Sequence, residues 1–176
     1  MSYYTYNGQK IKYQGKFAVG PAGFYDWFLP SRDELSNMKN NVATEAGMVF
    51  GIYWTSSEST ASTAIYQASG SGAALPKSNI YKVRACRQFN APLGSYSIKD
   101  QGPAGGWIFY VDGNLYMEAA PDDLPQSAWS NITNLLIGTT GLNIGDGITN
   151  TQSIINQTGH VNSAALLCKQ LFITVE

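Results

Sequence analysis

The chain has 176 residues, of which only 13% are charged and 12% are aromatic, and its formal net charge is -1. This length suits one domain or at most two small ones, and the aromatic content provides too much apolar contact area for a disordered chain. The near-zero net charge attracts no phosphates, so neither nucleic acid nor an anionic membrane is an expected partner.

The N-terminal segment, residues 1–19, predicts an arm or hairpin. Residues 10–13 and 16–19 suit short edge strands around a turn at Gly15. The polar start of the chain lacks a signal-peptide core, and no apolar run reaches the roughly 18 residues of a membrane span. Export by the secretory route and membrane insertion are therefore not expected.

A helix is predicted after Pro30. Ser31 and Glu34 have the spacing of a capping box, so the helix begins at Arg32 and Gly47 ends it. The residues that recur at helical spacing on one face, and so predict its contact with the core, are Leu35, Met38 and Val42.

Short strands are predicted next. Residues 51–57, 63–68 and 80–86 are separated by Ser, Gly and Pro turns and predict an antiparallel meander. Residues 107–111 form the strongest strand candidate, and Asp112-Gly113-Asn114 turns it into residues 115–119. We expect residues 107–111 to be a central strand in the same sheet system as residues 83–86.

The C-terminal part predicts a loop and two short helices. Residues 121–150 are loop-like, Thr151 can cap a helix through residues 154–155, and Gly159 breaks it. Ser163 can cap a second helix that carries Cys168.

Three blocks in the first half carry a family resemblance: residues 26–35 (DWFLPSRDEL), 53–58 (YWTSSE) and 83–87 (VRACR). In residue identity and in order along the chain, these blocks resemble the Legionella collagen-like protein C-terminal domain family. This resemblance implies an α+β, C-type lectin-like fold, found in bacterial surface proteins and phage tail proteins and used for adhesion or receptor recognition. The trio Trp27, Trp54 and Trp107 is then expected in the core.

The second half resembles the amino-terminal half of that family, which normally comes first. The residues that resemble that half are 102–110, 116–121, Trp129, 137–139, 150–151 and 164–168. The chain therefore resembles a circularly permuted member, with one domain at 20–176 built from halves 20–89 and 102–172 and joined by linker 90–101. Two incomplete halves that complete each other between neighbouring chains are the alternative.

The resemblance implies a non-enzymatic recognition or structural module of a phage tail or comparable surface assembly, on a virion or extracellular surface. Its expected partners are a cell-surface glycan or protein receptor, other assembly subunits and further copies of this chain. A stand-alone carbohydrate-binding lectin is the alternative. A formylglycine-generating type of oxidase, which uses a reactive cysteine pair, comes third.

The stretch from Glu58 to Tyr81 holds the expected ligand contacts, because sugar recognition combines planar polar groups with an aromatic face. The candidates are Glu58, Tyr66, Gln67, Lys77, Asn79 and Tyr81. Ordinary strand alternation with outward polar groups explains each of them equally well.

Other chemistry-bearing residues are few. The resemblance implies that Cys86 and Cys168 are neighbours, as a disulfide or as buried free thiols. His160 suits a solvated loop residue, and no catalytic motif accompanies it. The carboxylates Asp122, Asp123 and Asp146 suit turns and caps better than a cation site. No cofactor or metal is expected.

Overall fold

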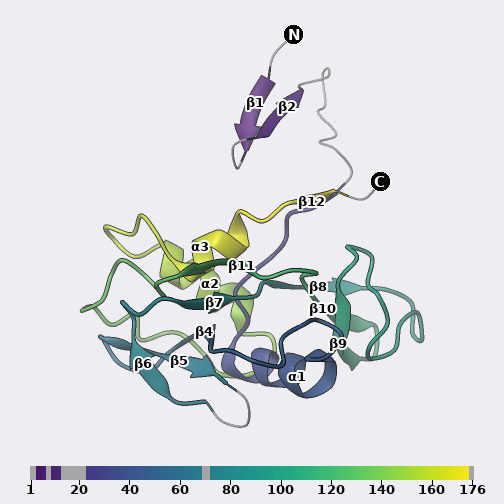
Figure 1. Cartoon of the computed structure of the whole chain (residues 1–176), viewed down its shortest axis with the longest axis horizontal. Helices are drawn as coiled ribbons and strands as arrows, with labels where there is room; N and C mark the ends of the chain where they lie inside the picture. The colour runs from purple at the N-terminus through teal and green to yellow at the C-terminus, as the bar shows by residue number, and fades with distance from the viewer. Residues whose placement is uncertain (1–2, 7–8, 13–22, 69–71, 175–176) are drawn as a thin grey trace.

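The computed structural model describes residues 3–6, 9–12, 23–68 and 72–174, which form a mixed α+β fold (Figure 1). This part of the chain contains three helices and four sheets, and the sheets are almost entirely antiparallel. The predicted fold class is confirmed at this level.

The largest sheet has the strand order β11-β7-β4-β5-β6. Its strands are β4 (Tyr53–Glu58), β5 (Thr63–Gln67), β6 (Ala74–Pro76), β7 (Tyr81–Val83) and β11 (Leu124–Ser127). Strands β4, β5 and β6 pair antiparallel, whereas β7 pairs in parallel with β4 on its other side. The predicted meander is wrong at its third strand, because the unpredicted β6 occupies the free edge of β5 and leaves β7 the edge of β4.

A second sheet has the order β8-β10-β9, with β8 (Cys86–Asn90), β9 (Trp107–Asp112) and β10 (Leu115–Ala119). The predicted hairpin is confirmed, and Gly113 takes a φ of +58° in its two-residue turn. The expected central position of residues 107–111 is wrong, since β10 is central and β9 is an edge. Residues 80–86 are split between β7 and β8, so Val83 and Cys86 lie in different sheets.

The first helix, α1 (Arg32–Val42), begins where the capping box predicted. The Ser31 hydroxyl accepts the Glu34 N–H at 3.3 Å, and the Glu34 carboxylate accepts the Ser31 N–H at 2.7 Å. The helix ends at Val42 rather than at Gly47, which lies beyond it in a turn with a φ of +67°.

The second helix, α2 (Gly147–Ile155), starts earlier than predicted. Thr151 is inside it and does not cap it, because its hydroxyl accepts the distant Leu29 N–H at 3.0 Å. The third helix, α3 (Ala164–Lys169), confirms the predicted cap, since the Ser163 hydroxyl accepts the Leu166 N–H at 2.9 Å.

Two apolar clusters lie on opposite sides of β4. Trp54 belongs to the cluster that includes α2 and α3, and its neighbour Tyr53 belongs to the cluster that includes α1. Side chains alternate between the two faces of a strand, so successive residues of β4 serve different clusters. Trp27 and Trp54 are fully buried, as predicted, whereas Trp107 is only partly buried. Both clusters combine residues from before position 90 and after position 102.

The two ends of the main body lie side by side. Strand β3 (Gly23–Phe24) pairs antiparallel with β12 (Ile173–Thr174), which brings the last described residues against the first ones of this body (Figure 1). The N-terminal segment forms a hairpin of β1 (Tyr3–Tyr6) and β2 (Gln9–Lys12). The predicted Gly15 turn and the strand at 16–19 lie outside the described residues.

None of the helices in the described ranges combines the length and the apolar character that crossing a membrane requires.

Candidate functional site

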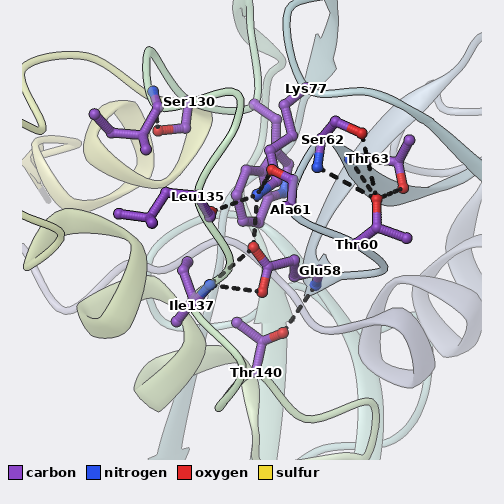
Figure 2. Close-up of polar contacts among 12 residues, drawn as sticks. Glu58, Thr60, Ala61, Ser62, Thr63, Lys77, Ser130, Leu135, Ile137 and Thr140 are labelled. Carbon is purple, nitrogen blue, oxygen red and sulfur yellow. Dashed lines mark hydrogen bonds and ion pairs between the residues drawn. The ribbon is translucent and has the colours of Figure 1, made fainter.

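Two of the predicted ligand residues form a buried ion pair. Glu58 ends β4 and Lys77 directly follows β6, and their side chains meet at 2.6 Å (Figure 2). The Lys77 side chain is 0% exposed and that of Glu58 is 2% exposed. An ion pair removed from water to this degree needs further hydrogen bonds to offset the loss of hydration.

The Lys77 ammonium finds these additional partners in two loops. It donates to the Ala61 carbonyl at 2.8 Å and to the Leu135 carbonyl at 3.3 Å. It also lies 4.9 Å from the ring centroid of Trp129, a cation–π contact. An ammonium has three N–H donors, so Glu58 and the two carbonyls use all of them.

The Glu58 carboxylate is held in the same way. It accepts the Ile137 N–H at 3.0 Å and the Gly138 N–H at 3.0 Å, and the backbone N–H of Glu58 donates to the Thr140 hydroxyl at 2.9 Å. The Glu58 carboxylate therefore holds residues 137–138, and the Glu58 backbone N–H holds Thr140, at the end of β4. Lys77 connects Leu135 to the β4–β5 turn (Figure 2).

This geometry gives Glu58 and Lys77 a structural role. Their polar atoms are buried and engaged with each other and with backbone groups, so a surface ligand has no free donor or acceptor to contact on either side chain. The expectation that they contact a ligand directly does not fit this arrangement, because the loop at 135–140 covers them.

The predicted tyrosines lie on the side of the sheet that faces the Trp54 cluster. Tyr66 is the cross-strand partner of Trp54, and the Tyr81 ring meets the Trp54 ring edge-on at 5.0 Å between centroids. Both tyrosines are partly buried against this cluster. The geometry favours a packing role for both tyrosines.

The two predicted amide side chains differ in position. The Asn79 amide donates to the Tyr81 hydroxyl at 3.0 Å and so orients that ring. Gln67 is the cross-strand partner of Tyr53, which places it on the opposite side of the sheet from Tyr66. The six predicted residues are thus divided between a buried pair and two sheet faces.

The two cysteines are free thiols and both are fully buried. Burial raises the pKa of both thiols, and the charges of Glu34 and Cys168 add to the rise of the Cys86 pKa. The thiolate form is therefore disfavoured at both positions, which is the opposite of what a reactive cysteine requires.

His160, Asp146 and Asp123 each have a hydrogen-bond partner. The His160 ring nitrogen lies 2.8 Å from the Ser163 hydroxyl, and burial lowers the pKa of His160. Asp146 accepts the Asn143 N–H at 2.8 Å just before α2, and Asp123 accepts from Arg84 at 2.8 Å. Asp122 is exposed. Within the described ranges, His, Cys, Asp and Glu side chains form no group of three that could hold a metal ion.

A second charge network, buried at Arg87 and Glu118 and half exposed at Asp26, was not predicted from the sequence. Arg87 binds both carboxylate oxygens of Asp26, at 2.8 and 3.0 Å, and contacts the buried Glu118 at 3.2 Å. Glu118 also accepts the N–H groups of Ala104 and Gly106. No sequence pattern links Asp26, Arg87 and Glu118, because they lie far apart in the chain.

The surface above the Glu58–Lys77 pair is irregular and partly apolar. Leu135 and Leu136 are 54% and 55% exposed, although the backbone beneath them is fastened by Lys77 and Glu58. We call residues 59–62 and 134–139 together the loop surface. The loop surface presents apolar and hydroxyl side chains on a backbone that is held in place.

No match was found. Neither protein-family models, nor curated proteins, nor solved structures yielded a counterpart to this chain.

The buried carboxyl group of Glu34 should make the stability of the protein depend on pH. Burial raises the pKa of its carboxyl above the ordinary value of 4.5, and hydrogen bonds from Ser31, Gly145 and Gly147 offset this only in part. A raised folded-state pKa means that the stability from this group is full below the unfolded pKa and is lost as pH rises through the folded one. We expect the free energy of unfolding of the native chain, relative to Glu34→Gln, to be higher at pH 4 than at pH 7. Urea titrations at both values measure it, and a pH-independent difference would contradict the assignment.

Proposed function

We propose that this chain is a non-enzymatic recognition or structural module of a phage tail or comparable surface assembly, which binds a cell-surface glycan or protein. The observation that carries this proposal is the loop surface. Its backbone is locked by a saturated, buried ion pair, while Leu135 and Leu136 remain exposed above it. A loop with no binding role would gain nothing from an ordered backbone that keeps Leu135 and Leu136 in water. An ordered backbone does lower the entropy cost of binding a partner, because the contact surface is already formed.

The proposal includes a C-type lectin-like fold in circularly permuted order. Three features support it: the α+β class, the shared clusters of the two halves, and the pairing of β3 with β12. In an unpermuted chain the link between residues 174 and 23 would be covalent, and the antiparallel pairing of Thr174 with Gly23 needs only a short turn for this.

A rearranged chain tests the permuted order. Joining Thr174 to Gly23 through a two-residue turn and opening the chain within 91–99 should give a protein with the same circular dichroism spectrum and a cooperative melting transition. New termini are tolerated where the two original ends lie close together. A rearranged chain that is unfolded while the parent is stable would contradict the permutation.

Surface variants test recognition. Leu135→Ser combined with Leu136→Ser should reduce adsorption to a glycan array or to a panel of bacterial cells by at least about tenfold, since central apolar contacts dominate interfaces. Val161→Ser, at a position that is 74% exposed outside the loop surface, is the matched control. Both variants should keep the parent melting temperature. Equal adsorption of all three proteins would place recognition elsewhere.

The solution size separates the assembly module from a stand-alone lectin. Residues 1–88 carry a net charge of +4 and residues 89–176 a net charge of -5, which suits head-to-tail contact between copies. Light scattering that gives a trimer or a larger ring supports an assembly subunit. A monomer at all concentrations supports the lectin.

A further inference from the structure

Two lysines from different elements converge on one tyrosine ring. The Lys39 ammonium on α1 lies 4.9 Å from the ring centroid of Tyr53, and the Lys82 ammonium on β7 lies 5.4 Å from it. Lys82 is the parallel cross-strand partner of Tyr53, so the sheet register itself directs it to this face. The Tyr53 ring is buried beneath them.

Gly51 makes room for this arrangement. A Cβ atom at Gly51 would lie 2.9 Å from Cδ of Lys82, so any other residue there would displace the lysine stem. The Gly51 backbone has a φ of +114°, which also favours glycine. Its carbonyl accepts from the Lys39 ammonium at the long distance of 3.4 Å. Gly51 therefore contacts both lysines.

The positive charge at this place exceeds the negative charge. Asp123 is shared between Arg84 at 2.8 Å, Lys82 at 3.5 Å and the Tyr53 hydroxyl at 3.0 Å. Arg84 is buried and donates three of its other four N–H groups to backbone carbonyls. Among the described residues, Lys39 has no carboxylate within ion-pair distance.

The two ammonium groups therefore repel each other. Burial lowers the pKa of Lys39, and the charge of Lys82 lowers it further, while Asp123 opposes this change. Like charges brought together at a partly exposed place are unfavourable unless an anion lies between them, and such clusters concentrate at binding sites.

Two exposed apolar residues directly precede Gly51 in the chain. Phe50 directly precedes Gly51 and is 79% exposed, and Val49 is 41% exposed. An exposed aromatic ring next to hydrogen-bond donors is the combination that binds a sugar, whose ring has an apolar face and a polar rim.

We propose that Lys39 and Lys82 bind the anionic group of an acidic saccharide, a carboxylate, sulfate or phosphate, whose sugar ring rests on Phe50. This site is distinct from the loop surface, and it stands whether or not the chain is a tail module. Tyr53 and Asp123 act as positioning residues: the buried Tyr53 ring lies beneath both ammonium groups, and the Asp123 carboxylate lies 3.5 Å from the Lys82 ammonium.

Calorimetric titration of the full chain tests this site. Glucuronate, glucose 6-sulfate and glucose 6-phosphate are the probes, and glucose is the neutral control. We expect at least one acidic sugar to bind at least about tenfold more tightly than glucose, and its affinity to fall with added salt. Lys39→Gln and Lys82→Gln should each weaken that binding about tenfold or more, with an unchanged melting temperature. Lys169→Gln, an exposed lysine at the end of α3, should bind like the parent.

Sodium sulfate and Phe50→Ser distinguish a sugar-borne anion from a free one. The proposal expects sodium sulfate to bind more weakly than the best acidic sugar, and Phe50→Ser to weaken the sugar but not the sulfate. If sulfate binds as tightly as that sugar and Phe50→Ser changes nothing, the saccharide assignment is overturned. If no acidic probe exceeds glucose, or if both lysine variants bind like the parent, the anion site itself is overturned.

Discussion

Replacing Lys77 with Met should lower the free energy of unfolding by about 3–5 kcal/mol, the usual cost of removing one partner from a buried ion pair. The change leaves the buried Glu58 carboxylate without its counter-charge and leaves the carbonyls of Ala61 and Leu135 without their donor. Urea unfolding followed by tryptophan fluorescence measures the effect. Against a total stability of about 5–15 kcal/mol this is a large fraction.

The double variant Glu58→Gln with Lys77→Met separates the charge from the packing. The neutral amide that replaces the Glu58 carboxylate can still accept the Ile137 and Gly138 N–H groups, so the double variant should be more stable than Lys77→Met alone. Lys169→Met, at an exposed position, should change stability by less than about 0.5 kcal/mol. A loss below about 1 kcal/mol in Lys77→Met would show that the pair does not hold the loop surface.

The second large effect is expected at Gly106. A Cβ atom at this position would overlap the backbone carbonyl oxygen of Ala119 in the neighbouring strand β10. The Gly106 N–H also donates to the buried Glu118 carboxylate at 2.8 Å, so moving the backbone would weaken the network with Arg87. Gly106→Ala should therefore cost about 3 kcal/mol or more, at the upper end for overpacking.

Gly105→Ala is the matched control for that variant. Gly105 has a φ of +79°, yet a Cβ atom there would meet no other atom within 4 Å. Its cost is limited to backbone strain, roughly 1 kcal/mol. Equal melting temperatures for Gly105→Ala and Gly106→Ala would mean that the close approach of Gly106 to β10 is not what stabilises this part of the sheet.

Local signals in the sequence predicted local structure well. The Ser31 and Glu34 box located the start of α1, Ser163 located the start of α3, and Asp112-Gly113-Asn114 located the β9–β10 turn. Each depends on groups within a few residues of one another. Thr151 looked like the same kind of cap, but its hydroxyl bonds to Leu29, and no local pattern contains that information.

In the candidate site, too, local sequence signals identified residues but not their distant partners. Sequence reasoning selected Glu58 and Lys77 for their polar chemistry, and the structure joins them to each other. Their remaining partners, the Ile137 and Gly138 N–H groups and the Leu135 carbonyl, come from a segment whose sequence predicted only a loop. Whether a charged side chain faces a ligand or a buried partner depends on that distant segment.

The sequence by itself determined two helix starts and one hairpin, because capping and turn geometry act over a few residues. The α+β class and the burial of Trp27 and Trp54 followed from the family resemblance. Only the tertiary structure decided the strand order, the burial of Lys77 and the meeting of Lys39 with Lys82 over Tyr53. These features depend on contacts between segments far apart in the chain. Burial removes water from a charged side chain, so the backbone groups that hydrogen-bond to it determine whether it has a structural or a binding role.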